Sequence, residues 1–141
     1  CAVDLGSGNG RIVNFLSLKT SAKMYGFENN QEMYNYSIKN LNKNAKIEYK
    51  DINLINYNNL DADCYIINTP FWNDTMLKNL IDKIFLSRIS SKKKYYIIII
   101  NIDVILKKIQ LNTIFTNFKL IKFINAGPIR SLRIYKSLEN R

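Results

Sequence analysis

The chain has 141 residues, of which 47% are hydrophobic and 12% aromatic, so it can bury a core and is not expected to be disordered. It has no histidine, which excludes Ser-His or Cys-His catalysis by this chain alone and the common histidine-containing zinc sites. Its two cysteines argue against a disulfide framework. The net charge of +10 indicates an anionic partner such as RNA, DNA or an acidic protein surface, although AT-rich coding also enriches lysine.

The chain begins on Cys1 inside a strand-like run, so we expect a single domain over residues 1–141 that lacks an N-terminal segment. Its longest apolar run, residues 95–100, is far too short to span a bilayer, and no membrane span is predicted. The low cysteine content makes a reducing, intracellular compartment the default, with the cytoplasm assumed.

Apolar periodicity predicts strands that alternate with helices along most of the chain. The predicted strands cover residues 1–5, 22–27, 45–49, 63–68, 95–102, 118–124 and 131–136, and the predicted helices cover residues 11–20, 31–41, 74–85 and 104–111. Such alternation implies right-handed crossovers and a mostly parallel sheet, in which the apolar strand 95–102 is covered on both faces. Too few residues join the last two strands for a crossover, so we predict an antiparallel hairpin in an α/β fold.

A glycine-rich loop follows the first predicted strand and opens a helix. Gly6, Gly8 and Gly10 permit positive φ angles and close approach of the backbone to a ligand. Their spacing is not the G-x-G-x-x-G of nicotinamide enzymes, and the loop lacks the Lys-Ser/Thr of a P-loop. Asp4 lies just before the loop, where a carboxylate repels a pyrophosphate but attracts the sulfonium and ammonium of S-adenosylmethionine. The alternative is a tight strand-to-helix turn with no ligand.

Two more acidic residues lie where the second and third predicted strands end. Glu28 follows the loop at the distance where dinucleotide-binding folds place a ribose-binding acid, and its two oxygens can accept from both ribose hydroxyls. Asp51 can accept from an adenine amine, while Ile52 can touch the ring. The alternatives are a solvated loop acid for Glu28 and an ordinary turn residue for Asp51.

Residues 3–13, Val-Asp-Leu-Gly-Ser-Gly-Asn-Gly-Arg-Ile-Val, resemble the first motif of class I S-adenosylmethionine-dependent methyltransferases, and Glu28 and Asp51 match that family's second and third cofactor acids. The resemblance covers essentially the whole chain. It implies a three-layer, Rossmann-like open sheet of seven strands, mostly parallel with an antiparallel C-terminal hairpin strand, and S-adenosyl-L-methionine as cofactor. The cofactor-binding residues that it implies are Asp4, Gly6, Ser7, Gly8, Asn9, Gly10, Glu28, Asp51, Ile52 and Asn68.

The loop after the fourth predicted strand is the candidate active site, because ligands of open α/β sheets lie beyond the carboxyl ends of the strands. Its sequence, Asn68-Thr69-Pro70-Phe71-Trp72, resembles the Asn/Asp-Pro-Pro-aromatic motif of amino-methyltransferases, with Thr69 in place of the first proline. We predict catalytic roles for Asn68, Pro70 and Phe71, with the Asn68 oxygen accepting from the nitrogen that receives the methyl. Phe71 and Trp72 can bind substrate by stacking on a base or enclosing a lysine stem, or they only cap the core.

We therefore expect a methyltransferase that N-methylates a macromolecule and needs no metal. Protein lysine is slightly favoured over RNA or DNA adenine, because the glycine motif, Thr69-Pro70 and Asn73-Asp74 also resemble small non-SET protein lysine methyltransferases. The alternatives are a non-catalytic methyltransferase-like subunit, which binds RNA or a larger assembly through its basic surface, and a small-molecule methyltransferase. Basic residues near the last two strands either extend a basic face or protect strand edges from aggregation. They are Arg130, Arg133, Lys136 and Arg141.

Overall fold

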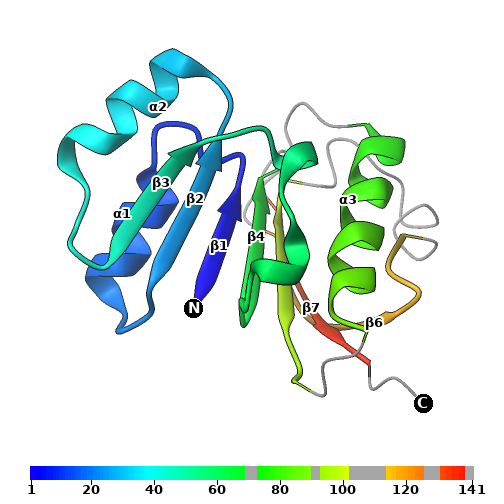
Figure 1. Ribbon diagram of the computed structural model, residues 1–141. Helices are drawn as coiled ribbons and strands as arrows, with labels where there is room; N and C mark the ends of the chain where they lie inside the picture. Colours follow the sequence, from blue (N-terminus) through cyan, green and yellow to red (C-terminus); the bar gives the residue numbers. More distant parts are fainter. Residues whose placement is uncertain (69–72, 90–92, 102–113, 126–130, 139–141) are drawn as a thin grey trace. The chain divides into compact units, whose positions relative to one another are not determined.

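The computed structural model describes residues 1–68, 73–89, 93–101, 114–125 and 131–138 (Figure 1). The chain divides into two compact units. Residues 1–56 and 61–67 form the first, and residues 57–60 and 68–141 belong to the second. In the described part of the chain, no helix is long and apolar enough to cross a membrane. The single-domain organisation stays a prediction.

The first unit is built on a parallel sheet with strand order β3-β2-β1-β4. The strands are β1 (Ala2–Leu5), β2 (Met24–Glu28), β3 (Ala45–Tyr49) and β4 (Cys64–Asn68), whose last residue is grouped with the second unit. All four residues of β1 are buried, and β1 has a paired neighbour on each side. Parallel pairing brings the carboxyl ends of β1, β2 and β3 to one edge of this sheet, so the loops that follow them lie together.

Two helices cover this sheet in Figure 1, α1 (Arg11–Lys19) and α2 (Gln31–Ser37). Asn30 caps α2 by accepting from the backbone N–H of Met33 at 3.0 Å. The predicted helix 31–41 is shorter in the structure, because the chain continues after Ser37 as the 3-10 turn η1 (Ile38–Asn40). The Ser37 hydroxyl donates to the Tyr34 carbonyl at 2.8 Å, a local bond of the kind that weakens a helix interior. The polar stretch after β3 forms the short turns η2 (Ile52–Leu54) and η3 (Tyr57–Asn59), the latter in the second unit.

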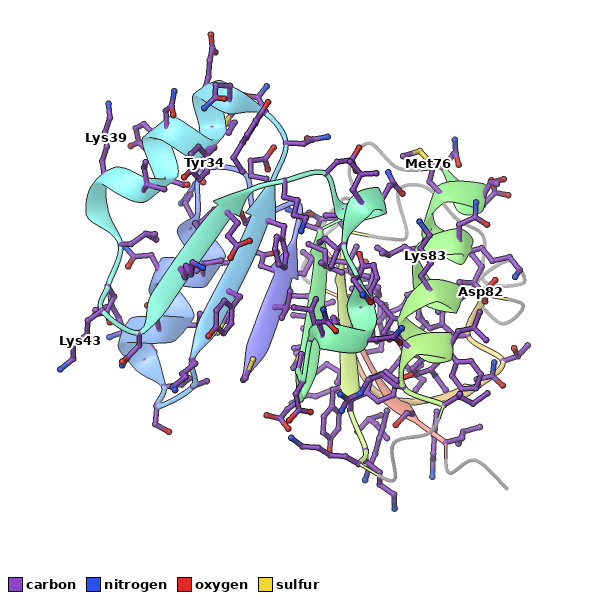
Figure 2. All side chains as sticks on the ribbon, viewed as in Figure 1. Tyr34, Lys39, Lys43, Met76, Asp82 and Lys83 are labelled. Atoms are coloured by element: carbon purple, nitrogen blue, oxygen red, sulfur yellow. The ribbon has the colours of Figure 1, made fainter. Side chains whose placement is uncertain are left out.

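In its described residues, the second unit contains α3 (Asp74–Ser87) and three antiparallel strands in the order β5-β7-β6. The strands are β5 (Tyr96–Ile100), β6 (Phe118–Asn125) and β7 (Ser131–Ser137). Asn73 caps α3 by accepting from the N–H of Met76 at 2.9 Å. The helix buries Leu77, Leu80, Ile81 and Ile84, whose spacing defines one helical face. On its outer surface lies Asp82 (Figure 2), which forms an ion pair with Lys78.

An aromatic cluster forms the centre of the second unit. The Phe118 ring meets Tyr95, Phe85 and Phe115 edge to face, with centroid distances of 5.8 to 6.2 Å. Phe115 also stacks on Tyr135 at 3.9 Å. Because each buried aromatic side chain contributes on the order of 2 kcal/mol, this cluster anchors β6 and β7 against α3.

The predicted fold class is confirmed. Among the described residues, seven strands follow the order β3-β2-β1-β4-β5-β7-β6, and β6 and β7 form the predicted antiparallel hairpin. The prediction that both faces of the strand at residues 95–102 are covered is wrong. Ile97 and Ile99 are buried, whereas Tyr96 is exposed, and the neighbour β7 is antiparallel. The predicted helix 104–111 lies outside the described residues.

Candidate functional site

The glycine loop between β1 and α1 has a backbone that favours glycine. Gly6, Gly8 and Gly10 have φ angles of 81°, 55° and 75°, all in the left-handed region. The N–H groups of Gly6 and Ser7 both donate to the Phe27 carbonyl, at 3.0 and 2.9 Å, which holds the loop over the end of β2. A Cβ atom added at Gly6 or Gly8 would meet no atom within 4 Å, so the space above these two residues is open.

Two other glycines serve packing. A Cβ atom at Gly10 would lie 2.7 Å from Cδ1 of Ile47, and one at Gly26 would lie 2.8 Å from the Ser7 hydroxyl. Gly10 therefore allows the start of α1 to approach β3, and Gly26 allows the loop to rest on β2. Gly26 was not among the predicted site residues. Its signal was present in the sequence, because an isolated glycine within a strand marks a close approach of other atoms.

Glu28 connects the glycine loop with the start of α2. Its Oε2 accepts from the N–H of Gly8 and its Oε1 from the N–H of Asn30, both at 2.7 Å. Its side chain is buried, and its own carbonyl accepts from the N–H of Lys50 at 2.8 Å. Since an ionised carboxylate has about four acceptor positions, each oxygen keeps capacity for a ligand hydroxyl. Glu28 is thus held in a fixed position at the carboxyl edge of the sheet, where the sequence predicted it.

Asp4 is a buried carboxyl group of β1, next to the glycine loop. It is 1% exposed, and neither carboxylate oxygen has a hydrogen-bond partner among the described residues. Burial, and secondly the charge of Glu28, raise the pKa of Asp4 from 3.8 to about 7. A buried carboxylate without partners is costly, so this position favours a ligand that brings a positive charge or a hydrogen-bond donor.

The remaining predicted cofactor residues of the first unit lie around the same edge. Ser7 is buried and Asn9 is exposed in the glycine loop. Asp51 follows β3, and its Oδ1 accepts from the backbone N–H of Asn53 at 2.8 Å. The structure therefore shows a turn-forming role for Asp51, with Ile52 half-buried as the first residue of η2. Contact of either residue with adenine stays a prediction.

Asn68 ends β4 and belongs with the second unit. Its Oδ1 accepts from Nδ2 of Asn101, the residue after β5, at 3.2 Å. Asn101 has a φ of 63°, the only positive value at a non-glycine residue in the described chain, and its N–H donates to the Ser131 carbonyl at 2.8 Å. An uncommon backbone conformation of this kind is often found at functional sites. Sequence reasoning missed Asn101. The predicted site residues Pro70, Phe71 and Trp72 lie outside the described residues.

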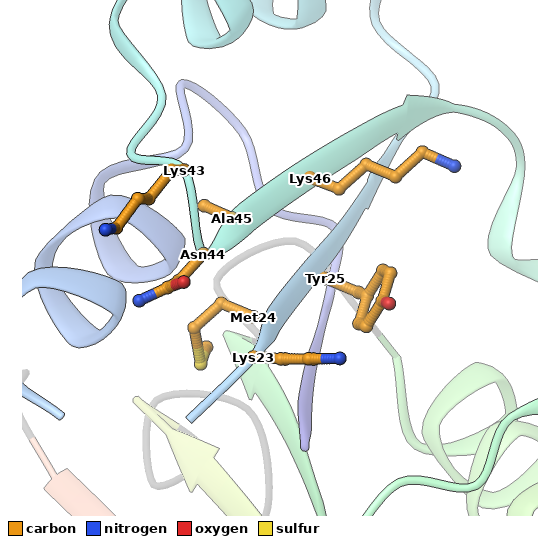
Figure 3. A pocket seen from close by; sticks show the side chains of 7 residues that line it. All are labelled: Lys23, Met24, Tyr25, Lys43, Asn44, Ala45 and Lys46. Carbon is orange, nitrogen blue, oxygen red and sulfur yellow. The ribbon is translucent and has the colours of Figure 1, made fainter. Parts of the chain in front are cut away.

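A pocket of about 220 Å³ lies at the other edge of the first unit, where β2 and β3 begin (Figure 3). Its polar lining comes mainly from Lys23, Lys43, Asn44 and Lys46. Lys46 forms an ion pair with Glu48 at 2.6 Å. Because lysines repel a sulfonium, this pocket does not suit the predicted cofactor, whose residues gather at the opposite ends of the strands. Within the described residues, no three acidic or cysteine side chains gather as a metal site.

Comparison with known proteins finds similarity of structure. No family model and no curated protein sequence matches the chain. A putative S-adenosylmethionine-dependent methyltransferase from Listeria monocytogenes matches with a TM-score of 0.73 and 11% identity, over 98% of this chain and 90% of that one. The ribosomal protein L11 methylase from Lactobacillus delbrueckii subsp. bulgaricus matches with a TM-score of 0.66 and 13% identity, over 99% and 70% of the two chains.

Human N-acetylserotonin methyltransferase, in a complex with S-adenosylmethionine, matches with a TM-score of 0.68 and 15% identity. That match covers 96% of this chain and 47% of the human one. At these identities the matches establish the fold and leave substrates open. The chain has the fold of the class I S-adenosylmethionine-dependent methyltransferases.

Proposed function

We propose that this chain binds S-adenosylmethionine at the glycine loop and transfers its methyl group to a nitrogen of a macromolecule. The observation that carries the proposal is the buried Asp4 carboxylate without partners, next to a loop with open space above Gly6 and Gly8. The α-ammonium and sulfonium of the cofactor supply the positive charge that Asp4 lacks. A dinucleotide would instead bring a pyrophosphate, which Asp4 repels.

The other residues of the loop edge fit the same ligand. Glu28 can accept from the ribose hydroxyls while it keeps its bonds to the N–H groups of Gly8 and Asn30. The Gly6 and Gly8 backbone lets the ligand approach without meeting a Cβ atom. Asp51 and Ile52 are proposed to contact the adenine.

When bound, the cofactor supplies an activated methyl group and a good leaving group, so the protein contributes mainly position and desolvation. The acceptor nitrogen would need a free lone pair, so a lysine ammonium would first give a proton to solvent. The methyl group would then pass to that nitrogen, and S-adenosylhomocysteine would be released. Asn68 is proposed to orient that nitrogen by accepting one of its N–H bonds. Its bond to Asn101 fixes the carboxamide, and the oxygen has a second lone pair for the substrate.

Binding is tested by titration calorimetry with S-adenosylhomocysteine, which lacks the reactive methyl. We expect Glu28→Ala to weaken binding by roughly 2–4 kcal/mol before compensation by water, because two charge-assisted bonds are lost. Ser21→Ala, a change at an exposed residue away from the loop, serves as control. Equal affinities of Glu28→Ala and the control, or tight binding of a nicotinamide dinucleotide, would contradict the assignment.

For the acceptor we propose protein lysine, with RNA or DNA adenine as the next candidate. The resemblance to small protein lysine methyltransferases supports this order, and one structural neighbour, the ribosomal protein L11 methylase, is named for a protein substrate. The test is transfer of radiolabelled methyl into whole-cell extract, followed by protease or nuclease digestion. Label that nuclease removes would reverse the order. If the chain binds cofactor but labels no polymer, the alternative of a non-catalytic methyltransferase-like subunit replaces the proposed reaction.

A further inference from the structure

The positive charge of the chain is not spread evenly. The first unit has seven Lys and Arg and seven Asp and Glu residues, so it is formally neutral. The second unit has fourteen Lys and Arg but four Asp and Glu residues, so the net charge of +10 resides there. A coding bias toward lysine alone would not separate the charges in this way. The imbalance points to a polyanion that contacts the second unit.

Within that unit, the described strands β5, β6 and β7 contain cations and no acidic residue. The antiparallel register places Lys119 of β6 directly opposite Lys136 of β7, and Lys136 opposite Tyr96 of β5. Paired residues point to the same face of a sheet, so these three side chains form one row across the strands, about 5 Å apart. Like charges in directly opposed positions destabilise a sheet, so this row lowers stability unless an anion compensates it.

A third lysine lies on the same face. Lys122 of β6 pairs with Ile134 of β7, about 7 Å along the strand from the first row. Lys119, Lys122 and Tyr96 are exposed, and the Lys136 ammonium lies 5.8 Å from the centre of the Tyr96 ring. Lysines on one face of the sheet beside an exposed aromatic ring combine the two features that bind a single-stranded nucleic acid, phosphate contacts and a surface on which a base can stack.

The lysine pocket of the first unit is the competing basic site. Its Lys46 is already neutralised by Glu48, and the unit around it has no excess charge. It also differs in shape, because it is a hollow lined by Lys23 and Lys43 at the strand ends and has no row of cations along a sheet. The second unit therefore carries the stronger case for a nucleic-acid surface.

We propose that the sheet face formed by Lys119, Lys122, Lys136 and Tyr96 binds single-stranded RNA. The lysines contact the phosphates, and a base stacks on Tyr96 when the Lys136 ammonium turns from the ring to a phosphate. This binding needs no cofactor and does not require RNA to be the methyl acceptor. It gives the chain a second ligand site, remote in sequence from the glycine loop.

The test uses the whole chain and fluorescence anisotropy with a labelled, mixed-sequence, single-stranded RNA oligonucleotide, between about 50 and 200 mM salt. Lys119→Glu should weaken RNA binding by about 10-fold or more and should flatten the salt dependence. The same variant should raise the melting temperature by about 1–4 °C, because a cross-strand ion pair with Lys136 replaces a repulsion. Opposite changes in binding and stability cannot come from partial unfolding.

Lys43→Glu is the matched control, since it changes the net charge equally at an exposed lysine that lines the pocket of the first unit (Figures 2 and 3). It should change RNA affinity by less than about 3-fold. Tyr96→Ala should weaken binding by about 10-fold, while Tyr96→Phe keeps the stacking ring and most of the affinity. Equal losses for Lys119→Glu and Lys43→Glu would overturn the proposed surface. If polyglutamate competes as strongly as RNA of equal charge, the ligand of this surface is not specifically a nucleic acid. If a duplex binds with equal affinity, the surface has no preference for single strands.

Discussion

The buried Asp4 carboxylate should couple cofactor binding to the release of a proton. Its pKa is raised to about 7 by burial and by Glu28, so roughly half of the ligand-free molecules carry a proton on Asp4 at pH 7. An ammonium placed beside this carboxylate favours the ionised form and lowers the pKa. If the pKa of the complex is well below 6, binding releases about nine-tenths of a proton at pH 6, about half at pH 7 and about a tenth at pH 8.

The same linkage fixes how affinity changes with pH. The association constant should increase about 5-fold from pH 6 to pH 7 and about 2-fold from pH 7 to pH 8, because the proton competes with the ligand less at each step. Titration calorimetry with S-adenosylhomocysteine, in buffers of equal pH but different ionisation enthalpy, measures the protons released. Asp4→Asn is the control, because it keeps the shape of the side chain and retains any protonation change of the ligand itself. Equal proton release by Asp4→Asn and the parent chain would refute the role given to Asp4.

Three further predictions follow from the same residues. Because the pKa of Asp4 is raised in the folded chain, the stability that Asp4 contributes is fully present below its unfolded pKa of 3.8 and is lost as the pH rises through about 7. Asp4→Asn should therefore be more stable than the parent at pH 8, by up to about 4 kcal/mol in urea unfolding, and as stable as the parent near pH 4. Gly8→Ala adds a Cβ into open space at a φ of 55°. This change should cost about 1–2 kcal/mol of stability and should lower the calorimetric affinity for S-adenosylhomocysteine more than about 10-fold. An unchanged affinity would show that the ligand does not bind at this loop. Asn68→Ala should lower the labelling rate about 100-fold while cofactor affinity stays the same, and Asn101→Gly, which keeps the backbone angle without the amide, should add little to it in the double variant. Additive losses would show that the two amides act separately.

The local features of the fold were predictable from the sequence because they depend on neighbouring residues. The spacing of Gly6, Gly8 and Gly10 identified the turn between β1 and α1, and the three glycines do adopt positive φ angles. The position of Glu28 at the end of β2 followed from the strand pattern. Its bonds to the N–H groups of Gly8 and Asn30 could not be predicted, because they depend on the exact height of the loop above the sheet.

Features that depend on distant pairing were less predictable. Asn101 carries no local signal for its contact with Asn68, since 33 residues separate them and asparagine tolerates positive φ in many turns. The apolar run of β5 suggested a strand covered on both faces, but its burial depends on β7 and on the aromatic cluster around Phe118. The proposed roles of Pro70, Phe71 and Trp72 remain predictions from the sequence.

Ile47 lies beneath the glycine loop, and this position extends the effect of a ligand to the edge of the sheet. Its side chain faces Gly10, the last glycine of the loop, as well as Gly26 of β2, so the end of the loop contacts β3, the outermost strand of the first unit. Backbone amides of an edge strand open easily and exchange their hydrogens with solvent. A ligand that holds the loop in place also holds Ile47, and through it the strand. Cofactor binding should therefore slow hydrogen exchange along β3, including at amides that never touch the ligand.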